Sequence, residues 1–138
     1  MANLYSQFTY DDDLEMKAAG LLAASADGSI IDLGEGLTDG FLVLDVSAVE
    51  VASTDEYYTV SLEGSTVAAM TSASVCLAKK VFGNVVVPMD DDCYLPGRYV
   101  IPFRNEENGE IQRYVRLSTL IAGTIATGIN FSAFIAKR

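Results

Sequence analysis

The chain has 138 residues, half of them apolar, a formal net charge of −10 and no histidine. This length and apolar content suit a single domain with one hydrophobic core, and they exclude a disordered or highly charged linker. The acidic balance argues against nucleic acid as a partner, because binding a phosphate backbone requires lysine and arginine. Without histidine, a serine or cysteine nucleophile lacks its usual base. We therefore expect a protein that is not an enzyme and needs no cofactor.

The charges are unevenly distributed along the chain. Residues 1–78 contain 13 acidic residues and one basic residue, Lys17, whereas residues 79–138 contain 8 basic and 6 acidic residues. Such a distribution fits a polarised surface that orients the domain against a partner. The simpler interpretation, which charge alone favours, is an acidic surface that only keeps the protein soluble.

The beginning of the chain is predicted to be an arm over residues 1–13, followed by the folded domain over residues 14–138. The arm carries the aromatic residues Tyr5, Phe8 and Tyr10, which either cover a sheet or bind a partner. It has neither the basic start nor the apolar run of a signal peptide, so we expect synthesis and folding in a reducing cytosol. Residues 13–24 are compatible with a short helix or with a continued extended arm.

Several segments alternate apolar and polar residues with a period of two, which is typical of strands with one buried face. The clear examples are residues 42–48, 58–63, 98–104, 114–121 and 129–135, and weaker apolar runs occupy residues 28–33, 75–82 and 85–89. Glycine, proline and Asn-Gly turn signals separate these runs. About eight strands at this spacing favour an all-β fold, an antiparallel β-sandwich with jelly-roll topology. Pro102 lies inside one run, so that strand should be at an edge or bulged.

Residues 117–136 are an uncharged stretch of 20 residues, long enough to cross a bilayer as a helix. Polar side chains and two glycines dilute its hydrophobicity. Its apolar residues from Ile129 to Ile135 alternate with a period of two. We therefore expect two strands here, and no membrane partner.

Asn108-Gly109 predicts a tight hairpin turn, because both residues tolerate the positive φ that primed turns require. The strands expected to flank this turn carry four arginines, Arg98, Arg104, Arg113 and Arg116. They could dock on an acidic partner through bidentate contacts. Alternatively, they pair with the nearby Glu106, Glu107 and Glu110, and contribute little.

The remaining candidates for chemistry are weak. The aspartate triplets at residues 11–13 and 90–92 could bind Ca²⁺ or remain solvated loop charge, and neither has the spacing of an EF-hand. Cys76 lies in an apolar run and is expected to be a buried free thiol, although a disulfide with Cys93 stays open. A carboxylate pair of the glycosidase type would have to come from the hairpin glutamates, whose exposure makes them poor general acids.

Several segments together resemble a known family. They are Tyr57–Ser65, residues 98–110 and 113–117, the opening Tyr-Asp-Asp-Asp at residues 10–13 and the closing Ile-Asn-Phe-Ser-Ala-Phe-Ile at residues 129–135. Taken in chain order, these segments resemble the jelly-roll cement (decoration) proteins of tailed bacteriophages. The resemblance implies a non-enzymatic β-sandwich on the outside of the virion capsid, made in the host cytoplasm. It would act as a homo-oligomer, a dimer or trimer, that binds the major capsid protein and bridges neighbouring subunits.

The resemblance carries no set of functional residues over to this chain. From the residues themselves, the predicted partner contacts are the arm aromatics and the hairpin arginines: Tyr5, Phe8, Tyr10, Arg98, Arg104, Arg113 and Arg116. The alternative is a carbohydrate- or receptor-binding module. That alternative would need a concave aromatic face or a Ca²⁺ site at an aspartate triplet.

Overall fold

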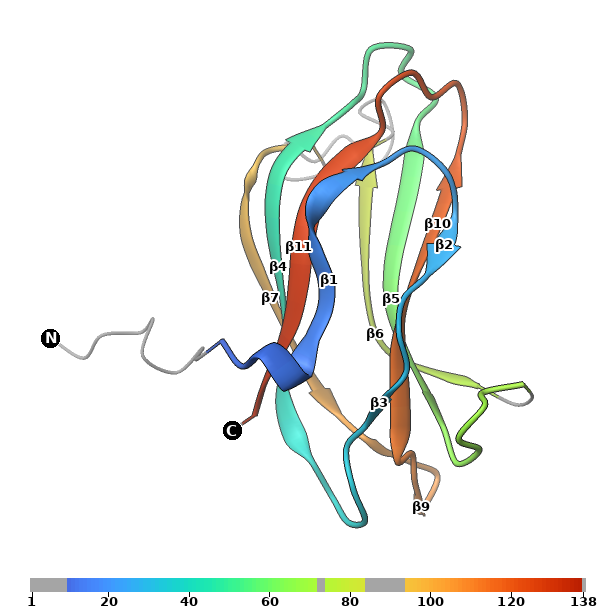
Figure 1. Ribbon diagram of the computed structural model, residues 1–138. Coiled ribbons are helices and arrows are strands. Elements are labelled where there is room, and N and C mark those ends of the chain that lie inside the picture. Colours follow the sequence, from blue (N-terminus) through green and yellow to red (C-terminus); the bar gives the residue numbers. More distant parts are fainter. Residues whose placement is uncertain (1–9, 72–73, 84–93, 138) are drawn as a thin grey trace, which may run out of the picture.

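A computed structural model of the chain describes residues 10–71, 74–83 and 94–137. Two antiparallel sheets pack face to face as a β-sandwich, one with strand order β1-β11-β4-β7 and the other with order β2-β10-β5-β6, where β3 also pairs with β10 (Figure 1). The elements are the 3₁₀-helix η2 (Asp12–Leu14) and the strands β1 (Glu15–Leu22), β2 (Ala26–Asp27), β3 (Ile31–Asp32), β4 (Asp39–Val49), β5 (Tyr57–Ser65), β6 (Val75–Gly83), β7 (Gly97–Arg104), β8 (Glu106–Glu107), β9 (Glu110–Ile111), β10 (Tyr114–Ala122) and β11 (Ile129–Lys137).

The strand order is that of a jelly roll. The short strands β2 and β3 pair with successive parts of β10, so they act as one interrupted strand. Among the described residues the two sheets then contain eight strands, in which the first pairs with the last, the second with the seventh, the third with the sixth and the fourth with the fifth. This nested pairing defines the jelly-roll wrap. The predicted jelly-roll β-sandwich is confirmed.

The core forms where the predicted alternation places it. Tyr58, Val60 and Leu62 of β5 are fully buried between the sheets, and the same holds for Val115 of β10 and Ile129 of β11. The residues between them point to the outer faces. The predicted edge position of Pro102 is also confirmed, because β7 is the last strand of its sheet.

The predicted turn at Asn108-Gly109 is confirmed. Both residues have positive φ, 55° and 82°, and they join β8 to β9 as a two-residue primed turn. The long strands before and after this ribbon do not pair with each other, however. β7 pairs with β4, and β10 pairs with β5 in the other sheet, so the hairpin is a small ribbon at one end of the sandwich (Figure 1).

Residues 13–24 do not form the expected short helix beyond the single 3₁₀ turn η2, and most of them are extended. The turn η2 leads into β1, an edge strand that pairs with β11. Alternation of apolar and polar residues does not predict this strand, because its register shifts between Glu15 and Lys17 and again between Lys17 and Gly20. Each shift turns the side chains that follow to the other face, so no period of two survives.

Lys17 holds this irregular edge in place. Its Nζ donates to the carbonyl oxygens of Ala18 at 3.1 Å, Gly20 at 2.9 Å and Phe131 at 2.8 Å, and it lies 4.6 Å from the centroid of the Phe131 ring. The three ammonium protons therefore all have acceptors. Partial burial lowers the pKa of this lysine.

Replacing Lys17 by methionine should lower the free energy of unfolding by about 1–3 kcal/mol, because charge-assisted hydrogen bonds to carbonyls contribute about this much. Urea denaturation measures the change. Lys79→Met, at an exposed position of β6, is the matched control and should change stability by less than about 0.5 kcal/mol. Equal effects of the two substitutions would show that the bonds from Lys17 add nothing.

The prediction of a buried thiol at Cys76 is wrong, because this residue is exposed. A register shift between Leu62 and Glu63 of the partner strand places Cys76 opposite Glu63 on the outer face. Cys93 and the predicted strand at 85–89 lie outside the described residues. No helix in the described part of the chain is long and apolar enough to cross a membrane, and the uncharged stretch at 117–136 lies mostly in β10 and β11.

Candidate functional site

The outer faces of the two sheets differ in chemistry. On the β2-β10-β5-β6 sheet the outward positions of β5 and β10 are mostly polar, as with Thr59, Ser61 and Ser118. On the β1-β11-β4-β7 sheet a second hydrophobic cluster lies outside the core. It consists of Phe41, Val43, Val100, Phe134 and Ala136, and we call it the apolar strip.

The apolar strip follows from strand register. Val43 of β4 lies between Phe134 of β11 and Val100 of β7, and Phe41 lies between Ala136 and Pro102. Val43 and Phe134 are 0% and 4% exposed although they face outward, whereas Phe41 and Val100 are only half-buried. The outer face of a sandwich sheet is usually polar, so this apolar strip sets the β1-β11-β4-β7 sheet apart from the other sheet.

Two of the predicted contact residues meet on this strip. The Tyr10 ring packs edge-to-face on Phe134 with centroids 5.5 Å apart, and the Arg98 guanidinium lies 5.7 Å from the same ring. Two hydrogen bonds to Asp45, at 2.6 and 2.9 Å, hold Arg98 in this position. The Tyr10 hydroxyl donates to the Glu15 carboxylate, which raises the pKa of the tyrosine.

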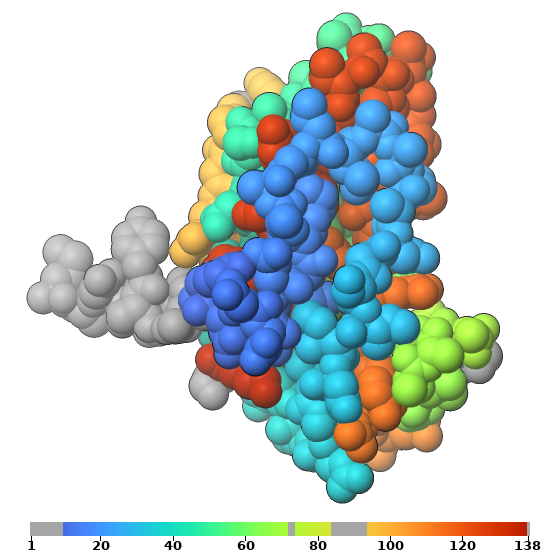
Figure 2. Space-filling view, viewed as in Figure 1, coloured from blue at the N-terminus to red at the C-terminus, as the bar shows by residue number. Residues whose placement is uncertain are grey.

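These groups surround a shallow hollow of about 320 Å³, which Lys17 also lines. In Figure 2 the blue residues of η2 and β1 protrude beside the red end of β11, at the margin of the same sheet. Phe134 is almost fully buried under these neighbours, and the Tyr10 ring is the exposed aromatic group of the hollow.

The four arginines do not form one surface. Arg104 lies on β7, on the same outer face as Arg98, and makes a looser pair with Asp39 at 3.7 Å. Arg116 lies on the outer face of the other sheet, and Arg113 lies just before β10. The expected hairpin surface is therefore wrong, because β7 and β10 belong to different sheets.

The partners of these arginines also differ from the expected hairpin glutamates. Within the described part of the chain, each salt bridge joins an arginine of the second half of the chain to an acidic residue of the first half: Arg98 to Asp45, Arg104 to Asp39, Arg113 to Asp32 and Glu35, and Arg116 to Asp27 and Glu63. The jelly roll explains this, because its nested order pairs early strands with late ones. The exposed pairs among them, such as Arg104 with Asp39, stabilise the fold little. The uneven charge along the sequence is thus partly neutralised across neighbouring strands.

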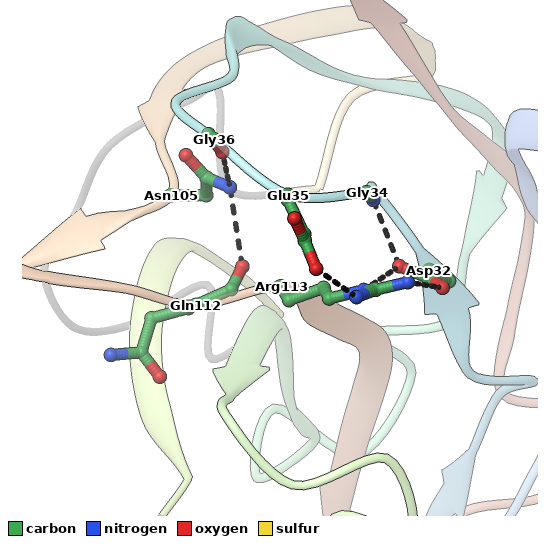
Figure 3. A network of polar contacts seen from close by, with 7 residues as sticks. All are labelled: Asp32, Gly34, Glu35, Gly36, Asn105, Gln112 and Arg113. Carbon is green, nitrogen blue, oxygen red and sulfur yellow. Dashed lines mark hydrogen bonds and ion pairs between the residues drawn. The ribbon is translucent and has the colours of Figure 1, made fainter.

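Arg113 and Asn105 tie the loop before β4 to the hairpin end of the sandwich (Figure 3). Arg113 donates to both carboxylate oxygens of Asp32, at 2.7 and 2.8 Å, and to Glu35 at 3.4 Å. The guanidinium and the Gly34 amide lower the pKa of Asp32 to about 2. This ion pair therefore stays formed down to strongly acidic pH.

Asn105 is fully buried and satisfies three backbone groups. Its Oδ1 accepts from the Thr38 amide at 2.7 Å, and its Nδ2 donates to the carbonyl oxygens of Gly36 and Gln112, both at 3.3 Å. One side chain thus joins the β3–β4 loop to the return of the β8–β9 ribbon. No sequence pattern singles out this residue.

Two acidic side chains hold the loop between β10 and β11 at the opposite end. The Glu50 carboxylate accepts hydrogen bonds from the amides of Ala126, Thr127 and Gly128, and Asp55 accepts from the amide and hydroxyl of Thr124. The amide donors lower the pKa of Glu50. Both carboxylates therefore stabilise the loop between β10 and β11.

Stability should depend on the ionisation of Glu50. Its folded-state pKa lies below the ordinary value of 4.5, so the stabilisation is present above that pH and is lost as the pH falls through the lowered pKa. We expect Glu50→Gln to lower the urea midpoint at pH 7, and the difference from the wild type to shrink as the pH falls through the lowered pKa of Glu50. Glu107→Gln, at the exposed hairpin, should leave the midpoint unchanged. A constant difference at every pH would contradict this role.

In the described ranges, no three histidine, cysteine or acidic side chains lie close enough together to hold a metal ion. At the first aspartate triplet, Asp11 instead caps η2 by accepting from the Asp13 amide at 3.0 Å. The second triplet, at residues 90–92, lies outside the described residues.

Glu56 is buried, with one carboxylate oxygen bound to the Ser53 amide at 2.7 Å.

No protein-family model and no curated protein matches this chain.

Of the predicted contact residues, the structure brings Tyr10 and Arg98 together and places Arg104 on the same face. It separates Arg113 and Arg116 from them, and Tyr5 and Phe8 lie outside the described residues. Sequence reasoning missed the apolar strip. The signal was present at residues 41–44 and 133–136, where the apolar residues are consecutive. A strand that is apolar on both faces has consecutive apolar residues in its sequence and no alternation with polar ones.

Proposed function

We propose that this protein is a non-enzymatic cement protein that binds the outside of a phage capsid and bridges neighbouring major capsid subunits. The observation that carries the proposal is the apolar strip with Tyr10 and Arg98 beside it, on the outer face of one sheet of a jelly roll. Such a face suits docking on a broad protein surface. The polar outer face of the other sheet is suited to remain in solvent.

The same proposal accounts for the rest of the molecule. The described residues group no metal ligands, and the chain contains no histidine to serve as a base. A lattice of identical shell subunits allows many weak contacts to add up when the bound protein is a dimer or trimer. The net charge of −10 would keep decorated particles dispersed. The resemblance of Tyr57–Ser65 and the arginine-bearing segments to phage cement proteins points the same way.

Co-sedimentation with expanded heads of the source phage tests the proposal directly. The purified protein should bind saturably, at a fixed ratio to the major capsid protein, and should raise the temperature at which the heads disrupt. Absence of saturable binding would contradict the proposal. A positive glycan array in that case would favour the alternative, a carbohydrate- or receptor-binding module.

A further inference from the structure

The two sheets have four edges, and three of them are poorly suited to accept a further strand. β1 has two register shifts, β2 and β3 share one edge with two residues each, and β7 contains Pro102, which cannot donate a backbone hydrogen bond. β6 has nine residues and no proline, and its ladder with β5 is regular from Ala78 to Gly83. A regular edge strand presents unpaired N–H and C=O groups. Within the described part of the chain, β6 is therefore the edge at which another strand fits best.

Lys80 lies in the middle of this edge strand and points toward the interior of the sandwich. Its partner in the ladder is Val60, which is fully buried, whereas the neighbouring Lys79 pairs with Ser61 on the outer face. The Lys80 Nζ lies 5.1 Å from the centroid of the Tyr99 ring, which belongs to β7 of the other sheet. Among the described carboxylates, none forms a salt bridge with Lys80. Its ammonium group therefore keeps its positive charge on the side of the sandwich between β6 and β7.

An inward lysine at this position opposes the addition of a strand. A strand that joined β6 would set its own inward side chains beside Lys80 and would remove part of the water around the ammonium group. If that strand were β6 of a second copy, antiparallel pairing about a two-fold axis would bring two Lys80 side chains onto one shared inner face. Desolvation and like-charge repulsion both disfavour this arrangement.

We propose that Lys80 prevents copies of this chain from joining through their β6 edges. The excluded partner is a second copy, because β6 itself contains no acidic side chain that could pair with the lysine. Any dimer or trimer in which the protein acts must then form through another surface. This inference holds whether or not the protein binds capsids.

Removing the inward charge tests the proposal. Lys80→Met keeps an unbranched apolar side chain beside the Tyr99 ring, and Lys80→Val is a second variant with high strand propensity. Sedimentation velocity of the full-length protein over a range of concentrations measures association. We expect both variants to associate further than the wild type, with an association constant raised by about 100-fold or more. In the associated form, the amides of residues 75–83 should exchange their hydrogens more slowly.

Two matched variants separate the inward charge from other effects of substitution. Lys80→Arg keeps the inward charge, and Lys79→Met removes the neighbouring charge from the outer face, so both should sediment like the wild type. Urea denaturation checks that each variant is folded. Unchanged sedimentation of folded Lys80→Met or Lys80→Val would overturn the proposal. Equal association of Lys79→Met, or association that leaves hydrogen exchange at residues 75–83 unchanged, would overturn it as well.

Discussion

Replacing Asn105 by aspartate is expected to lower the free energy of unfolding by at least about 3 kcal/mol. The substitution keeps the shape of the side chain and removes its two N–H donors. A carboxylate oxygen would then face the carbonyl oxygens of Gly36 and Gln112, to which Nδ2 now donates at 3.3 Å. The site is fully buried, so water cannot compensate for the lost bonds or solvate the charge.

Two measurements separate this cause from a general effect of the substitution. Asn130→Asp, at a half-buried position of β11, should change stability by less than about 1 kcal/mol. The deficit of Asn105→Asp should also shrink as the pH falls towards about 4, because burial disfavours the charged form and protonation restores a donor. A small deficit at neutral pH would show that the β3–β4 loop is held by other contacts.

Much of the fold can be predicted because burial imposes a strict period on regular strands. The alternation in β5, β10 and β11 identifies both the strands and their inward faces. Pro102 and Asn108-Gly109 add an edge and a turn for the same reason, since each residue type restricts the backbone in a known way. These are local rules, and they apply wherever the ladder is regular.

The errors arise where the ladder is irregular. At β1 and at Cys76, a register shift reverses which face a side chain occupies. The types of the neighbouring residues do not predict this shift. Hydrogen bonds such as those from Lys17 to three carbonyls stabilise the irregularity. Sequence periodicity cannot show such contacts, because the acceptor at Phe131 is distant in the chain.

The arginine surface fails for a topological reason. Residues that flank a hairpin turn are expected to be neighbours, but in a jelly roll the chain can cross from one sheet to the other at this point. Arg98 and Arg116 therefore lie on opposite outer faces. The nested order also explains why the acidic first half and the more basic second half are complementary, since Asp45 faces Arg98 and Glu63 faces Arg116 across paired strands.

This separation gives the proposed function its sharpest prediction. If the β1-β11-β4-β7 sheet faces the capsid, substituting both Tyr10 and Arg98 by serine should weaken binding to heads by about 1,000-fold, because tyrosine and arginine at an interface centre each contribute about 2 kcal/mol. Several copies of the site act together in an oligomer, so the apparent loss should exceed that of one site. Quantitative co-sedimentation over a range of protein concentrations measures it.

The other sheet offers a matched control with the same residue types. Tyr114 and Arg116 lie on the outward parity of β10 and are half-buried, with Arg116 bound to Glu63 at 2.9 Å. Substituting both by serine should change head binding by no more than about threefold, while each double variant keeps its urea midpoint near that of the wild type. The reverse result would place the docking surface on the polar sheet.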